Sequence, residues 1–342
     1  MDISAPLRLR VDRDALVANW QALDRLSGRA ACGAAVKANG YGLGATLVAE
    51  TLADAGCRDF FVASWAEALA LAPLGLSLCV LHGLRQEDMA AAKAGVARPA
   101  LSTPEQIARW RESGGGACDV MVDTGMNRLG VSVDAVAEGL LDGLEIDTLL
   151  SHLACADEDV PMNARQLAAF AGLKGRTTAR RMSLANSAGI GLGEDYHFDL
   201  TRPGLALYGG VPRPDMAAHL RQVARPEAQI LQRRQVPAGE TVGYNATWTA
   251  PVETQVAIVN LGYADGYRRA LSGLGVALLE GESLPVIGRV SMDLTAIDVS
   301  ARPDLAEGDW LAMDYDLAQA STLSGVSQYE LLTGLGQRFG RG

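Results

Sequence analysis

Residues 32–56 read CGAAVKANGYGLGATLVAETLADAG, which is a short apolar run, a glycine-rich loop and an amphipathic segment in succession. The run CGAAVKA has the length of a buried strand, and its apolar residues end at a single lysine, Lys37. From Ala45 onward, apolar residues recur at three- and four-residue spacing, which predicts a helix that stops at Gly56. The stretch is therefore one strand, one loop and one helix, the repeating unit of an α/β fold.

The same rhythm continues to about residue 210. Further strands are predicted at DFFVAS, LCVLH, RPALS, CDVMVD, DTLLSHLA, RRMSLA and LALYGG. Helices are predicted at WAEALALA, TPEQIARWRESGG and NARQLAAFAGLKG, with Thr103 as a helix cap and Gly114 as a helix stop. Eight strands that alternate with helices predict a parallel sheet, either open and doubly wound or closed into a barrel.

The pattern changes after about residue 220. The segments AQILQRRQV, TVGYNATWTA, TQVAIVNLG, GVALLEG and LTAIDVS resemble strands, and helical periodicity returns only at VSQYELLTGLGQRF. We predict an α/β domain over residues 1–220 and a mostly-β domain over residues 221–342. Residues 1–11 contain most of the alternating segment LRLRVD, which could pair with the β domain.

Composition limits the class of protein. The 342 residues are 49% hydrophobic and 20% charged, as in a globular enzyme, and the net charge of -10 argues against nucleic-acid or anionic-membrane partners. The five cysteines form no CxxC pair, which disfavours a structural metal site and favours a reducing compartment. The N-terminus has no apolar signal core, and no stretch is long enough to span a bilayer. We therefore expect a cytoplasmic protein.

Lys37 is the first candidate for chemistry. A lysine at the end of a strand is most often a side chain that extends to solvent, but the C-terminal ends of parallel strands form the active face of such folds. A desolvated amine is suited to bond a carbonyl cofactor such as pyridoxal 5'-phosphate (PLP). The glycine-rich loop also satisfies a dinucleotide-binding pattern, but Ser64 stands where a nicotinamide site needs an acid, and Asp59 is at the wrong end of that strand.

Eight segments resemble, in order and spacing, the signature segments of alanine racemase: VKANGYGLG, DTGMNRLG, SHLACAD, ANSAG, RPGLALYGG, VGYNATW, LGYADGYRR and GRVSMD. The resemblance implies a fold-type III PLP enzyme with an N-terminal (β/α)8 TIM-type barrel and a C-terminal β domain. It also implies a homodimer whose two active sites lie between the subunits. The implied reaction is the interconversion of L- and D-alanine, which supplies D-alanine for peptidoglycan.

The resemblance assigns two catalytic bases. Lys37 would hold PLP covalently and would act as a base on one face of the substrate carbon. Tyr244, from the partner subunit, would act on the opposite face, because one lysine cannot easily reach both sides of a planar carbon. A tyrosine in a β segment is ordinarily a packing residue, and the resemblance reverses that reading.

The resemblance also assigns binding residues. The implied cofactor contacts are Tyr41, His152, Ser187, Arg202, Gly204 and Leu205, with Tyr208 as a further candidate. Arg202 would donate to the pyridine nitrogen and leave it unprotonated. Arg128 and the backbone amide of Met292 would bind the substrate carboxylate. The implied lining of the substrate access corridor is Asp157, Tyr263, Arg269 and Arg289.

The chain departs from the family pattern at four positions. Met121 stands where many members have a lysine that steadies the arginine equivalent to Arg128, so another group must orient Arg128. The other departures are Leu43, Ser291 and Gln337. A serine-preferring or broad-specificity racemase would share every catalytic part, and Gln337 could receive a serine hydroxyl. A non-catalytic PLP-binding barrel would share Lys37 but would lack the β domain and the second base.

Overall fold

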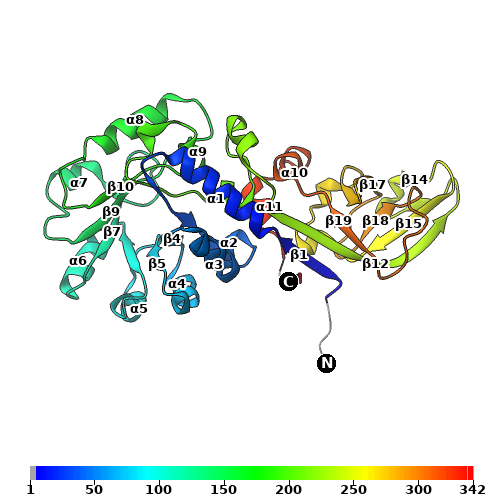
Figure 1. The fold of residues 1–342 in the computed structure, drawn as a ribbon, viewed down its shortest axis with the longest axis horizontal. Helices are drawn as coiled ribbons and strands as arrows, with labels where there is room; N and C mark the ends of the chain where they lie inside the picture. Colours follow the sequence, from blue (N-terminus) through cyan, green and yellow to red (C-terminus); the bar gives the residue numbers. More distant parts are fainter. Residues whose placement is uncertain (1–4, 337, 342) are drawn as a thin grey trace. The chain divides into compact units, whose positions relative to one another are not determined.

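The computed structural model describes residues 5–336 and 338–341. The chain forms two compact units, one that contains Arg13–Arg221 and one in which the N-terminal segment up to Asp12 joins Gln222–Gly342 (Figure 1). Within the described residues, no helix has both the length and the apolar character needed to cross a membrane.

Parallel strands form the centre of the first unit. They are β2 (Ala31–Cys32), β3 (Ala34–Ala35), β4 (Asp59–Val62), β5 (Ser77–Val80), β6 (Arg98–Leu101), β7 (Cys118–Asp123), β9 (Ile146–Leu150), β10 (Arg181–Ser183) and β11 (Leu200–Thr201). Strands β3 to β10 pair in chain order, the short β8 (Val131–Ser132) adds to β7, and β11 pairs with β2. Backbone bonds from Asp199 to Met182 and from Arg202 to Ala185 join β11 to β10, so the ring closes as a barrel.

Helices lie outside this ring (Figure 1). They are α1 (Arg13–Ser27), α3 (Ala45–Ala55), α4 (Trp65–Leu71), α5 (Met89–Lys93), α6 (Pro104–Glu112), α7 (Val133–Ala137), α8 (Pro161–Ala171) and α9 (Ser187–Ile190). The segment α2 (Lys37–Tyr41) is a left-handed turn that follows β3. Thr103 caps α6 as expected, because its side chain accepts a hydrogen bond from the Gln106 amide.

The strand predicted at LALYGG is wrong. Leu205–Tyr208 is a 3-10 turn, η4, and the last barrel strand is the earlier β11. Pro203 has no N–H to offer a sheet, and the Ser187 hydroxyl accepts hydrogen bonds from the backbone amides of Gly204, just before this turn, and of Ala206 within it. These backbone amides are therefore paired with a side chain and not with a neighbouring β-strand.

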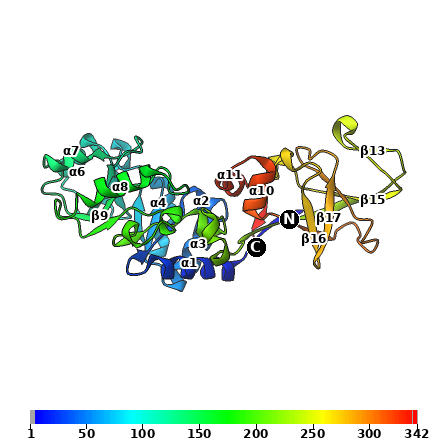
Figure 2. The same ribbon diagram turned by 90° about the horizontal axis from the view of Figure 1, so that it is seen from above.

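The second unit is mostly β. Its strands are β1 (Leu7–Val11), β12 (Ala224–Val236), β13 (Thr241–Val242), β14 (Trp248–Thr249), β15 (Thr254–Val259), β16 (Val276–Leu279), β17 (Glu282–Ile287), β18 (Thr295–Asp298), β19 (Trp310–Met313) and β20 (Gly340–Arg341). The sheet order is β15-β18-β17-β16-β19-β12-β1-β20, and β12 also pairs with β15. The helices α10 (Leu317–Ser324) and α11 (Gln328–Thr333) lie beside each other (Figures 1 and 2).

Two segments of this unit can be compared with the sequence predictions. The alternating segment LRLRV is β1, and it runs antiparallel to β12 with Leu7 and Leu9 buried. The segment TVGYNATWTA is not one continuous strand, because the hairpin β13–β14 is interrupted by a 3-10 turn, η6, over Tyr244–Ala246. A barrel with an antiparallel β domain is the architecture that the sequence predicted.

Candidate active site

The loop after β3 has an unusual backbone. Residues 38–41 all lie in the left-handed region, with φ of 53°, 55°, 63° and 53°. A left-handed turn costs roughly 1–2 kcal/mol for each non-glycine residue, so other contacts must hold it. The Glu67 carboxylate accepts hydrogen bonds from the backbone amides of Ala38 and Ala63, each at 2.7 Å. One side chain of α4 therefore fixes the turn that begins at Lys37.

Lys37 is half-buried at the start of this turn. Burial lowers the pKa of its amine, and the positive charges of Arg128 and Arg202 lower it further, while the Glu67 carboxylate opposes the shift. A lysine with a lowered pKa has more of the neutral, nucleophilic amine at a given pH. The surrounding cations also favour an anionic ligand beside it.

Burial lowers the pKa of both Arg202 and His152. Arg202 is 6% exposed; burial lowers the pKa of its guanidinium to about 10, so it stays charged at neutral pH. It donates to the Ser183 hydroxyl and to the Ser151 carbonyl oxygen. Burial and the charges of Arg202, Arg128 and Lys37 lower the pKa of His152 to about 3, so its imidazole is neutral.

A small cradle lies beside the lysine loop. The Ser187 hydroxyl accepts hydrogen bonds from two backbone amides of the 204–206 turn, at 2.9 and 3.2 Å. The Tyr41 ring stacks on Tyr208 with 4.6 Å between the ring centroids. A Cβ at Gly204 would lie 2.2 Å from the Tyr41 hydroxyl oxygen, so only glycine lets this hydroxyl approach the backbone here. The hydroxyls and backbone amides needed for a phosphate group thus lie together.

Two other predicted cofactor contacts lie on the same turn. Leu205 follows Gly204 and is buried. Tyr208 is fully buried, and its hydroxyl donates to the Ala35 carbonyl oxygen at 2.8 Å. That hydroxyl is therefore committed to the backbone of β3, and Tyr41 is the better placed of the two tyrosines.

The loop that carries Arg128 is held through its backbone. The Asp123 carboxylate, at the end of β7, accepts hydrogen bonds from the amides of Gly125 and Arg128, at 2.8 and 3.1 Å. These backbone bonds hold the pKa of Asp123 below its usual value. Met121 is buried in the same strand, at the position where the resemblance to alanine racemase implies a steadying lysine. Orientation of Arg128 therefore begins with Asp123.

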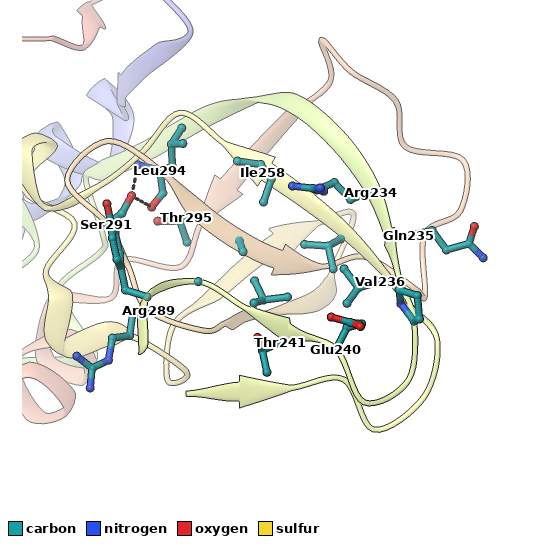
Figure 3. Close-up of a pocket in the computed structure, with 16 residues that line it drawn as sticks. Arg234, Gln235, Val236, Glu240, Thr241, Ile258, Arg289, Ser291, Leu294 and Thr295 are labelled. Carbon is teal, nitrogen blue, oxygen red and sulfur yellow. Dashed lines mark hydrogen bonds between the residues drawn. The ribbon is translucent and has the colours of Figure 1, made fainter. Parts of the chain in front are cut away.

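The remaining predicted residues of the barrel unit and the β unit are largely exposed. Asp157 lies on the exposed loop that follows His152. In the β unit, Tyr244 is 66% exposed and lines a cavity of about 740 Å³. Arg289 lines the same cavity (Figure 3). Arg269 is exposed on the 3-10 turn η8 (Arg269–Leu271).

Tyr263 and Met292 are brought together by two adjacent backbone segments. The Tyr263 amide donates to the Ser291 carbonyl, and the Ala264 amide donates to the Met292 carbonyl, each at 3.0 Å. The Ser291 hydroxyl is occupied locally, because it donates to the Leu294 carbonyl at 2.8 Å (Figure 3). Gln337 lies outside the described residues.

Sequence reasoning missed the groups that support these residues. Glu67 was visible as the fourth residue of a Ser-x-x-Glu capping box that begins at Ser64, and Asp123 was visible inside the segment DTGMNRLG. No local pattern marks Ser183 as the partner of Arg202, because the contact depends on the closed barrel.

The arrangement fits pyridoxal phosphate. Lys37 offers an amine for a carbonyl group, and the Ser187–Gly204 cradle offers a place for a phosphate. The charged Arg202, beside the neutral His152, suits an aromatic ring nitrogen. This fit rests on the depressed pKa of Lys37 and on the close approach of the Tyr41 hydroxyl to the Gly204 backbone.

Comparison with known proteins gives the family. The profile described as alanine racemase, N-terminal domain, matches residues 11–212, and the profile for the alanine racemase C-terminal domain matches residues 223–342. An alanine racemase of Acidiphilium cryptum is 43% identical, over 97% of both chains. The biosynthetic alanine racemase of Agrobacterium fabrum is 41% identical, over 98% of this chain and 93% of that protein.

Solved structures agree. The alanine racemase of Bartonella henselae with covalently bound pyridoxal phosphate has a TM-score of 0.88 and 34% identity, with 99% of each chain covered. The biosynthetic enzyme of Pseudomonas aeruginosa has a TM-score of 0.87 and 31% identity, with 99% of each chain covered. The chain therefore belongs to the alanine racemase family of pyridoxal-phosphate-dependent amino-acid isomerases.

Proposed function

We propose that this enzyme interconverts L- and D-alanine with two bases, Lys37 and Tyr244 of the partner subunit. When bound, PLP supplies the electron sink that makes the Cα–H bond of the substrate acidic enough to break. One base takes the proton from one face of the carbon, and the other delivers a proton to the opposite face. In the D-to-L direction the two bases exchange roles.

The observation that carries this proposal is Lys37 at the strand end. Its amine has a lowered pKa and lies in the field of Arg128 and Arg202, so more of the neutral base is present at a given pH. Arg128 is proposed to hold the substrate carboxylate, with help from the backbone amide of Met292. The Arg202 guanidinium has N–H donors and no acceptor atom. It can therefore form a hydrogen bond with a ring nitrogen only when that nitrogen carries no proton, and it favours the unprotonated ring.

A second copy of the chain is proposed to complete each site. Tyr244 is 66% exposed beside an open cavity, and a general base works best when water is excluded around it. A homodimer that covers this face would bring Tyr244 of the partner subunit to the substrate. Asp157, Tyr263, Arg269 and Arg289 are proposed to line the access corridor, where charged groups suit a zwitterionic amino acid.

The cellular role is proposed to be supply of D-alanine for peptidoglycan in the cytoplasm. All five cysteines are free thiols, as a reducing compartment favours. Relatives from Agrobacterium fabrum carry both biosynthetic and catabolic names, at 41% and 43% identity, so similarity does not choose between the roles. Growth of a D-alanine auxotroph that expresses this chain, without added D-alanine, tests the biosynthetic role.

The deciding experiment is chiral analysis of L- and D-amino acids after incubation with the purified holoenzyme. Either alanine enantiomer should approach an equal mixture, because enantiomers have equal free energies. Serine and larger amino acids in the same panel distinguish an alanine enzyme from a broad-specificity racemase. Retention of optical purity by alanine, with the cofactor demonstrably bound, contradicts the proposal.

A further inference from the structure

Gln166 lies on α8, outside the ring of strands, and its side chain contacts the loops that follow β7 and β9. The residue is fully buried. Its Oε1 accepts a hydrogen bond from the Ala154 amide at 2.8 Å, and its Nε2 donates to the His152 carbonyl at 2.9 Å and to Thr124 Oγ1 at 3.2 Å. The amide fits in one orientation only, because its oxygen meets an N–H and its nitrogen meets two oxygens.

These contacts continue to the candidate cofactor residues. Thr124 follows the last residue of β7, at the base of the loop that carries Arg128, and its hydroxyl lies 2.8 Å from the Ser151 hydroxyl. Ser151 follows β9, and its carbonyl oxygen accepts a hydrogen bond from Arg202. Since Gln166 Nε2 can only donate, Thr124 accepts from it and keeps its own proton for Ser151.

We infer that Gln166 is a positioning residue for the cofactor site. Through one amide it sets the backbone that carries His152, and through Thr124 and Ser151 it sets the acceptor that orients Arg202. The same contact fixes Thr124 at the base of the Arg128 loop, three residues after Met121, which stands where many family members have a steadying lysine. The inference rests on the proposed function, because it takes His152, Arg202 and Arg128 as cofactor and substrate contacts.

A buried glutamine with satisfied hydrogen bonds can also serve stability alone. The two roles differ in what a substitution changes. A stabilising residue alters unfolding but leaves the bound cofactor in its normal environment. A positioning residue also alters the absorbance of the bound cofactor, its dissociation constant and the pH profile of kcat/KM.

Gln166→Glu is the sharpest substitution, because it keeps the shape and replaces the donating nitrogen by an oxygen that faces the His152 carbonyl. In the holoenzyme, kcat/KM should fall ~10–100-fold, as expected when reacting groups shift by a fraction of an ångström. The PLP dissociation constant, measured by equilibrium dialysis, should rise roughly 10-fold, in line with losses of supporting contacts at bound groups. The absorbance band of the bound cofactor should shift.

The matched control is Asn163→Asp on the same helix. Asn163 is also a buried amide, and it donates to the Cys155 and Glu158 carbonyls at 3.0 and 2.8 Å. It should lower thermal stability but leave the cofactor band and the PLP dissociation constant unchanged. If Gln166→Glu behaves like this control in both readouts, the inference is wrong.

Thr124→Val provides a second variant that preserves shape and removes the link to Ser151. It should shift the cofactor band in the same direction as Gln166→Glu and raise the PLP dissociation constant. A normal band and a normal constant for Thr124→Val overturn the inference, even if Gln166→Glu does not fold. Failure of the proposed function is separate, because it would be seen as absence of alanine racemisation in the wild-type enzyme.

Discussion

The backbone amide of Ala38 lies 2.7 Å from Oε1 of Glu67, so the carboxylate of one helix holds the first residue of the left-handed turn after Lys37. The other carboxylate oxygen accepts from the Ala63 amide just after β4. The ends of the neighbouring strands β3 and β4 are thereby joined at the point where Lys37, the proposed base, follows β3.

Glu67→Ala should therefore damage both stability and cofactor binding. Loss of a charged acceptor for backbone amides costs about 1.5–3 kcal/mol of unfolding free energy. The released turn should also weaken PLP binding. Urea unfolding and equilibrium dialysis measure the two effects. The control is Glu330→Ala, which removes the capping-box glutamate of α11 and should leave PLP affinity unchanged. Normal PLP affinity in Glu67→Ala would show that the turn keeps its conformation without the Glu67 carboxylate.

His152 should make the apoprotein sensitive to acid. Its folded pKa is about 3, below the ordinary value of 6.5, so the unfolded chain binds a proton first as pH falls. Stability should decline between about pH 6.5 and pH 3, at up to roughly 1.4 kcal/mol per pH unit. His152→Gln should flatten this decline in urea unfolding at pH 7 and pH 5. The exposed His219, changed to Gln, is the control and should leave the slope unchanged.

Gly204→Ala should close the cradle. The backbone at this position has φ of -129° and ψ of -86°, outside the α and β regions that alanine prefers, and the added methyl would also meet the Tyr41 hydroxyl oxygen. Overpacking of this kind costs about 1–3 kcal/mol, and the displaced Tyr41 should also lower PLP affinity. Gly116→Ala is the control, because an added Cβ there meets nothing within 4 Å. Equal PLP affinity for both variants would exclude a cradle role for position 204.

The two bases should be separable by substrate handedness. In D2O, Tyr244→Phe should lose most Cα exchange from L-alanine and keep part of the exchange from D-alanine through Lys37. Loss of a general base costs ~10²–10⁴ in rate. Mass spectrometry of each enantiomer measures the exchange. Wild-type exchange from both enantiomers would remove Tyr244 from the mechanism.

Mixed dimers should reveal whether the site is shared. Lys37→Ala and Tyr244→Phe are each expected to be inactive in racemisation. After subunit exchange, a heterodimer should contain one site with both native bases and recover part of the activity. Native mass spectrometry verifies the heterodimer. No recovery in verified heterodimers would place both bases in one chain.

The sequence by itself determined the features that depend on near neighbours. The βα rhythm, the cap at Thr103, the position of Lys37 at a strand end and the change to β structure after about residue 220 all follow from local periodicity and hydrogen bonding. The signature segments identified the family, and the comparisons confirmed it.

Tertiary structure decided what depends on distant partners. LALYGG has the composition of a strand, but the hydroxyl of Ser187 and the preceding proline make it a 3-10 turn. The left-handed turn at Lys37 persists because Glu67 holds it from another helix. Arg202 acquires its partners only when β11 joins β10 and the ring closes, and Gln166 reaches Thr124 only when β7 pairs with β9, because these contacts join strand ends that are far apart in the chain. Secondary-structure propensity depends only on residues that are close in the sequence, so it cannot predict such contacts, and they are specified only in the folded barrel.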